Sequence, residues 1–347
     1  MAKKPIWGVV WVLALAMVAC GEDGESSGVS VDGENPDSVG ADGQPTTEDT
    51  IVSQADAGST GDDVQIPSGI DSAGIADIGE VSECEETCGF GERCNDGTCE
   101  PTTVLFARIS HTKKVGLTGT AYAGEAFACT LQPNPKGEGT QLILLEKDGC
   151  KATVVRAGTS SANPSHVPVA LSSGGVVFSG LSVPRIQLFP GETLESACVK
   201  QDLPGEAGPF VSGGTVTMDF QLLPDLQDNV TRSFPSPKPV TPTFGELIWG
   251  ESLTVMWDAQ GADFMVVGFS AADPVSQDTG LVLCTFPDNG RATVPGVFME
   301  YLPIGATTVN STITRYWSHH DEPEGFNSVV EIQAFTQHQQ VLSQKPK

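Results

Sequence analysis

Residues 250–269 read GESLTVMWDAQGADFMVVGF and carry the strongest structural signal in the chain. Leu253, Val255 and Trp257 occupy alternate positions, and successive side chains of a β-strand point to opposite faces of its sheet. This alternation predicts a half-buried strand at 252–259. The apolar run that follows predicts a second strand at 263–271.

Segments of the same kind recur along the chain and predict a mainly β protein. Clusters of glycine, proline, asparagine and aspartate separate them, which is typical of an antiparallel β-sandwich. Within FPDNGRA, Asp288, Asn289 and Gly290 predict a hairpin turn between two strands. The other expected strands are 103–110, 141–146, 152–157, 176–183, 186–189, 215–222, 280–286, 291–298, 307–317 and 328–336.

A proline-rich segment divides the expected sandwich into two halves. Residues 232–244 read RSFPSPKPVTPTF, with prolines at positions 235, 237, 239 and 242. Proline at this density cannot continue a central strand, because it lacks the N–H that a strand ladder needs. We therefore expect a β-sandwich domain at 103–233, a linker or crossing segment at 234–243, and a second domain at 244–347.

The stretch 250–269 resembles the tryptophan-bearing strand and its neighbour in fibronectin type III and immunoglobulin-like sandwiches. Over Gly250 to Pro303, the pattern LTVMW…DFMVVGF…LVLCTFPDNGRATVP…LP is similar to uncharacterised myxobacterial-type surface lipoproteins. The resemblance implies an Ig/FnIII-like β-sandwich at the cell surface and brings no activity with it.

The N-terminus has the pattern of an export signal. Lys3 and Lys4 precede fifteen uncharged, mostly apolar residues at positions 5–19. A membrane-spanning helix needs about 20 apolar residues, so this run fits a signal peptide better than a spanning segment. We expect residues 1–19 to be the signal peptide.

Met17-Val18-Ala19-Cys20 resembles the lipobox of bacterial lipoproteins. The resemblance implies cleavage before Cys20, diacylglycerol on its thiol and acylation of the new N-terminus, which together anchor a protein stably. Gly21 stands where an inner-membrane retention signal has aspartate, so the outer membrane is the expected address. The alternative is an ordinary secretory signal with Cys20 unmodified. No other cofactor is expected.

Residues 20–82 predict an acidic, disordered linker behind the anchor. Positions 21–80 hold fifteen Asp and Glu residues and no Lys or Arg, in a chain of formal net charge −26. Such a composition cannot bury enough apolar surface to fold. Calcium binding is the alternative, but the regular spacing of a calcium loop is missing. The acidity also excludes nucleic acid as an expected partner, because phosphates need a basic surface.

Residues 83–100 predict a small cysteine-rich knot. Zinc binding is one interpretation of its four cysteines, and two disulfides are the other, favoured behind an export signal. The segment resembles half of an EGF-like module, and this analogy implies Cys84–Cys94 with Cys88–Cys99. The spacing alone allows three pairings.

Four more cysteines fall in the body and predict two further disulfides. Cys129–Cys150 is the more local choice, which leaves Cys198–Cys284 to tie the two halves together. If the second bond exists, the halves form one cooperative unit.

Chemistry-bearing motifs are scarce, and no catalytic residue is expected. The loop YWSHHDEPEGF places His319, His320 and Asp321 side by side, and such groups can bind a transition metal or calcium. On a strand, adjacent histidines point to opposite faces, so one ion could reach both only if the loop bends. A solvated turn is the alternative.

The sequence therefore predicts a non-enzymatic, lipid-anchored protein of the cell envelope. Its β-sandwich domains are expected to serve binding, adhesion or envelope structure. The expected partners are the membrane, through the lipid, and an extracellular or envelope protein or polysaccharide. Two alternatives remain, namely a hydrolase with its site in the sandwich loops and a metal-dependent adhesin that uses the His319 loop.

Overall fold

The computed structural model describes most of the chain beyond the knot. The signal peptide, Cys20 and the linker expected at 20–82 lie outside the described residues. The described residues are Cys84, 88–116, 118–134, 142–156, 166–169, 175–190, 193, 197–203, 205–206, 208–221, 230–323 and 328–345.

The described part is mainly β, which confirms the expected fold class. Its largest sheet has ten strands in the order β10-β4-β3-β19-β18-β15-β16-β6-β5, with β7 paired to β4. The bounds are β3 Thr103–Gly116, β4 Gly119–Pro133, β5 Leu142–Lys147, β6 Cys150–Val155, β7 His166–Pro168, β10 Cys198–Leu203, β15 Phe264–Ala272, β16 Thr279–Phe286, β18 Thr308–Asp321 and β19 Ser328–Ser343.

Three smaller sheets accompany it. One has four strands, β12-β11-β8-β9, another has three, β13-β14-β17, and β1-β2 form the knot. The short helix α2 follows β17. The bounds are β1 Glu92–Asn95, β2 Thr98–Pro101, β8 Val176–Ser179, β9 Ile186–Leu188, β11 Thr215–Phe220, β12 Val230–Pro235, β13 Thr243–Phe244, β14 Leu253–Met256, β17 Arg291–Val294 and α2 Gly296–Met299.

The four-stranded and three-stranded sheets pack on one face of the ten-stranded sheet and enclose two cores. On β18, Val309 and Ile313 belong to the core beneath the three-stranded sheet, whereas Trp317 belongs to the core beneath the four-stranded sheet. All three are odd-numbered residues of one strand, so they point to the same face. We call this the core face, and the opposite face the open face.

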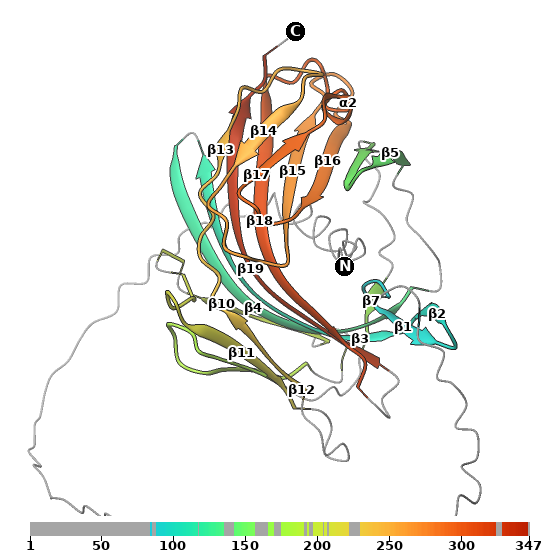
Figure 1. The fold of residues 1–347 in the computed structure, drawn as a ribbon, viewed down its shortest axis with the longest axis vertical. Coiled ribbons are helices and arrows are strands. Elements are labelled where there is room, and N and C mark those ends of the chain that lie inside the picture. Colours follow the sequence, from blue (N-terminus) through green and yellow to red (C-terminus); the bar gives the residue numbers. More distant parts are fainter. Residues whose placement is uncertain are drawn as a thin grey trace, which may run out of the picture. The chain divides into compact units, whose positions relative to one another are not determined.

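The halves expected at 103–233 and 244–347 share the ten-stranded sheet. β19 pairs parallel with β3, from Ser328 beside Thr103 to Gln340 beside Val115, and antiparallel with β18. Figure 1 shows these long strands passing from one small sheet to the other. The described residues belong to one compact unit, so each sandwich takes one of its two layers from a common sheet.

The proline-rich segment passes from one small sheet to the other, between β12 and β13. It is held in place where it crosses. Arg315 Nη1 and Thr336 Oγ1 both donate hydrogen bonds to the carbonyl oxygen of Lys238, at 3.2 and 2.8 Å. Val240 is buried in the core beneath the three-stranded sheet. The crossing is therefore a fixed part of the body.

The disulfides confirm one expectation and correct another. The knot has Cys84–Cys94 and Cys88–Cys99, as the EGF analogy implies. The expected Cys129–Cys150 and Cys198–Cys284 bonds are wrong, because the structure has Cys129–Cys198 and Cys150–Cys284. Strand register decides this pairing. Cys198 lies opposite Cys129 in the β10–β4 ladder, and Cys284 lies opposite Cys150 in the β16–β6 ladder.

The turn at Asp288 is also not the expected hairpin. It connects β16 of the ten-stranded sheet to β17 of the three-stranded sheet, so the strands on either side do not pair. The Asp288 side chain is buried and accepts hydrogen bonds from Trp257 Nε1 at 2.7 Å and from the backbone N–H groups of Gln260 and Ala262. Arg315 forms an ion pair with the same carboxylate at 3.3 Å.

Candidate binding groove

A groove of about 410 Å³ lies on the open face, over β15, β16, β18 and β19, with the far end of β3 as one wall. Its volume falls within the range of roughly 300–1,000 Å³ that is common for small-ligand sites. Val266, Gly268 and Ser270 of β15 line it, and they alternate with Val267 and Phe269, which belong to the core beneath the three-stranded sheet. All of its lining residues belong to strands of the ten-stranded sheet.

One row of neighbouring residues crosses the groove from strand to strand. Strand register places Lys114, Gln339, Thr312, Gly268 and Leu283 next to one another on five consecutive strands, from β3 to β16. All five line the groove. The row therefore changes from polar at the β3 wall to apolar at β16.

A hydrogen-bonded chain of amides and hydroxyls forms the polar half of the floor. Gln339 Nε2 donates to Gln337 Oε1 at 2.6 Å, and Gln337 Nε2 donates to Thr314 Oγ1 at 3.0 Å. These bonds fix the orientation of both glutamine side chains. The floor thus presents ordered donors and acceptors.

Gly268 lies in the floor of the groove, close to the side chains of Thr312 and Leu283. A Cβ atom there would lie 2.6 Å from Thr312 Oγ1 and 2.9 Å from Leu283 Cδ2, so any larger residue would push these neighbours aside. Glycine inside a strand often marks a close approach of this kind. Leu283 and Leu281 of β16, with Val266, make the apolar half of the lining, in which Leu281 is partly exposed and the other two are buried.

The groove is almost uncharged, although the chain is strongly acidic. Among the described residues that line it, there is no Asp, Glu or His, and Lys114 is the one charged side chain. Tyr316 lies at the floor, and burial raises the pKa of its phenol, so it stays protonated and neutral. The lining therefore offers neutral hydrogen-bonding groups beside an apolar strip.

The structure does not bring the expected metal ligands together. The alternation of β18 points His319 and Asp321 to the core face and His320 to the open face. The His319 ring lies 5.0 Å from the Phe234 ring, and the Asp321 carboxylate accepts a hydrogen bond from Arg232.

His320 serves a different contact, which holds the knot on the open face. Its Nδ1 lies 2.8 Å from Glu331 Oε1, and that carboxylate also accepts a hydrogen bond from the Gly91 N–H at 3.2 Å. Glu322 accepts a hydrogen bond from the Cys94 N–H at 3.2 Å. Burial opposes the charged imidazole, yet the hydrogen bonds and charges of Glu331 and Glu322 outweigh it and raise the pKa of His320. Burial raises the pKa of Glu331.

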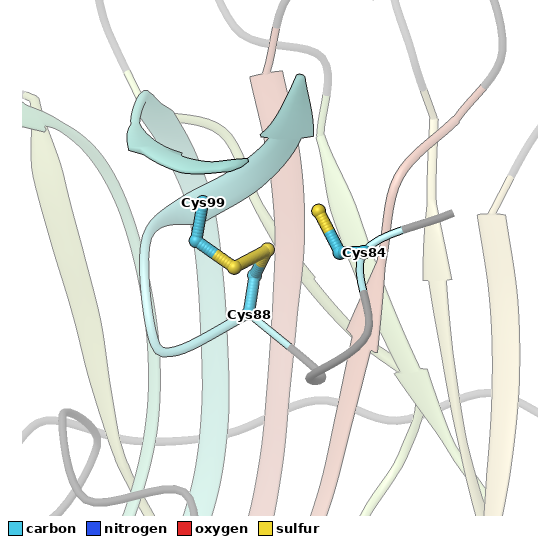
Figure 2. Close-up of side chains that lie close together, drawn as sticks. All are labelled: Cys84, Cys88 and Cys99. Carbon is cyan, nitrogen blue, oxygen red and sulfur yellow. A yellow bond between two sulfur atoms is a disulfide. The ribbon is translucent and has the colours of Figure 1, made fainter. Parts of the chain in front are cut away.

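The knot itself brings three sulfur atoms together. Figure 2 shows the Cys88–Cys99 disulfide with the sulfur of Cys84 beside it, and the three sulfurs lie within 4.8 Å of one another. Since all three belong to disulfides, none is available as a thiolate ligand. In this structure the cluster is a covalent cross-link.

The sequence analysis did not single out any residue of the groove. Gln337 and Gln339 stand two positions apart in β19, and this alternation of amides is a signal that places both on one face. Thr312, the neighbour of Gln339 in the sheet, lies on another strand, and Gly268 lies on a third. Only the strand register reveals that these residues meet.

Comparisons with known proteins leave the chain without an assigned family. No protein family and no curated protein matches the sequence. Among solved structures, the yeast delta-COP-I mu-homology domain is similar to this chain with 8% sequence identity and a TM-score of 0.20, over 71% of this chain and 98% of that domain. A likeness this low carries no conclusion about function. Within the described residues, no helix is both long and apolar enough to cross a bilayer.

Proposed function

We propose that this protein is a non-enzymatic lipoprotein of the bacterial cell envelope that binds a ligand in the open-face groove. The signal sequence and the lipobox at Met17–Cys20 support lipid anchorage, and Gly21 supports the outer membrane as its address. The groove supports the binding role.

The composition of the groove lining is the observation that carries the binding role. The lining combines fixed amides and hydroxyls with an apolar strip, as ligand sites generally do. General acid–base catalysis needs a titratable group such as His, Asp or Glu near the substrate. Among the described lining residues only Lys114 and Tyr316 carry a titratable group, and no His, Asp or Glu stands beside them in the lining, which favours binding over the hydrolase alternative.

The linker would let the anchored body reach ligands away from the membrane. Taken as a flexible coil, a linker of about 60 residues would have a root-mean-square reach of roughly 40–45 Å, and repulsion between its carboxylates would extend it. The knot then joins this linker to the body at the open face, through Gly91 and Cys94. The linker and the knot thus precede the strands that form the groove along the chain.

A retention assay on envelope fragments tests the binding role. Envelopes extracted with detergent lose their lipids, so retention of the protein on them no longer reports the anchor. Thr312→Phe fills the groove, whereas Thr254→Phe adds the same ring to the exposed face of β14 and serves as the control. We expect wild type and Thr254→Phe to sediment with the fragments and Thr312→Phe to stay in solution. Equal retention of all three proteins contradicts the role.

A further inference from the structure

We infer that the ligand of the groove is an uncharged glycan, a chain of neutral sugar residues. The inference rests on the proposed binding function and specifies its ligand class. Three features of the groove lead to it, namely its lack of charge, the separation of its polar and apolar halves, and the complete pairing of its backbone.

The first feature is charge. A charged group that leaves water needs a partner of opposite charge in the site. The groove offers one ammonium group, Lys114, at the β3 wall, and the described lining residues include no carboxylate. An anionic chain could pair with Lys114 at one point only, and a cationic chain would find no partner there. An uncharged polar ligand avoids this penalty.

The second feature is the separation of polar and apolar groups. Gln337, Gln339 and Thr312 lie on one side of Gly268, and Leu281 and Leu283 lie on the other. A sugar ring carries hydroxyl groups around its edge and C–H groups on its faces. Amides and hydroxyls both donate and accept hydrogen bonds, as sugar hydroxyls do. A ring across Gly268 can therefore place C–H groups on the leucines and hydroxyls on the amides.

The third feature distinguishes a glycan from an extended peptide. Peptides that bind to sheets commonly add a strand at an exposed edge, where main-chain groups are unpaired. The floor strands β15, β18 and β19 each have a hydrogen-bonded neighbour on both sides. A peptide in the groove would thus find side chains alone for its regularly spaced amides. A sugar chain needs no main-chain partner.

Calorimetric titration of the purified, acylated full-length mature protein tests the inference. Polyoxyethylene micelles are the appropriate medium, because sugar-headed detergents would compete for the groove. The neutral probes are cellohexaose, maltoheptaose and chitopentaose. An alginate oligomer serves as the anionic probe, and an uncharged peptide of glycine and serine serves as the peptide probe.

The variants separate the groove from the rest of the surface. We expect at least one neutral oligosaccharide to bind, with affinity reduced roughly tenfold or more by Thr312→Phe and about fivefold by Gln339→Leu, which removes one hydrogen-bonding amide. Thr254→Phe should leave the affinity unchanged. Gln339→Leu adds no bulk, so it keeps the test valid if Thr312→Phe disturbs folding.

The outcomes distinguish the ligand class from the binding role. Failure of every neutral oligosaccharide to bind overturns the glycan inference, and so does binding that neither groove variant weakens. If only the peptide or the alginate binds, and Thr312→Phe abolishes it, the glycan inference fails while the binding role stands. If no probe binds and all variants are retained equally on envelope fragments, both fail.

Discussion

Gln333 lies in the middle of β19 with its side chain fully buried. Within the described structure, neither its amide nitrogen nor its amide oxygen has a hydrogen-bond partner. A buried polar group without a partner lowers stability by about 1–3 kcal/mol. It is therefore a weak point in the centre of the sheet.

Replacing this amide should stabilise the protein. Gln333→Met keeps the length of the side chain and removes the unpaired atoms, so we expect the free energy of unfolding to rise by about 1 kcal/mol. Gln337→Met is the matched control, because the Gln337 amide is bonded to Thr314 and Gln339. It should lower stability instead. Urea unfolding of both variants measures whether the free energy of unfolding rises or falls in each. A loss of stability in Gln333→Met would contradict this account.

Arg315 should matter far more than an exposed arginine. Its side chain is 0% exposed and faces Asp288, which is 1% exposed. Removing one partner of a buried ion pair leaves an uncompensated charge and typically lowers stability by about 3–5 kcal/mol. We expect Arg315→Met to show a loss of this size in urea unfolding, and Asp288→Asn in the same protein to restore part of it. Arg232→Met, in a half-exposed pair, should change stability by about 1 kcal/mol or less.

At the level of secondary-structure elements, we expect the attachment of the knot to β18 and β19 to depend on pH. His320 has a raised pKa in the folded protein, so the folded state holds its proton more tightly than the unfolded state does. The stability that His320 contributes is fully present below its ordinary pKa of 6.5 and is lost as the pH rises through the raised value. Glu331 also has a raised pKa, so its ionisation changes stability in the same direction.

His320→Gln should therefore weaken the knot attachment mainly in mildly acidic solution. We expect the difference in unfolding free energy between wild type and His320→Gln to be largest just below pH 6.5 and to shrink as the pH rises. Urea unfolding across this range measures the difference, and limited proteolysis between the knot and β3 reports the attachment itself. A difference in unfolding free energy between the two proteins that grows with pH would contradict the expected pH dependence.

Some elements could be predicted from the sequence and others could not, for physical reasons. The alternation of Leu253, Val255 and Trp257 predicts a half-buried strand, and β14 lies there. β4 was not predicted, because GTAYAGEAFACTLQP is rich in glycine and alanine, which have low strand propensity. β4 forms because it pairs with β3 from Gly119 to Leu131, most of its length.

At the scale of the whole molecule, strand register is the information that the sequence does not reveal. Cys129 finds Cys198 rather than Cys150 because β10 lies beside β4. The groove has the same origin, since Gly268, Thr312 and Gln339 meet through the pairing of three strands. Apolar patterns identify strands one at a time, but not the order in which a sheet arranges them.

The disulfides that cross the body should contribute more stability than those of the knot. Cys150–Cys284 closes a loop with a sequence separation of 134, whereas Cys84–Cys94 closes one of 10. In the chain-entropy model, this ratio corresponds to about 2 kcal/mol in favour of the longer loop. We expect replacement of both cysteines by alanine to lower the free energy of unfolding more for the Cys150–Cys284 pair. Equal losses of unfolding free energy for the two pairs would show that loop length does not set the stability that each disulfide contributes.

The proposed location of the protein depends on one residue, Cys20, and the proposed function depends on that location. Mass spectrometry of the mature N-terminus from wild type and from Cys20→Ser tests it most directly. The account predicts that the wild-type chain begins at Cys20 and carries the added mass of diacylglycerol and an N-terminal acyl chain, and that Cys20→Ser carries no lipid. A wild-type chain that begins elsewhere, or an unmodified Cys20, would contradict lipid anchorage.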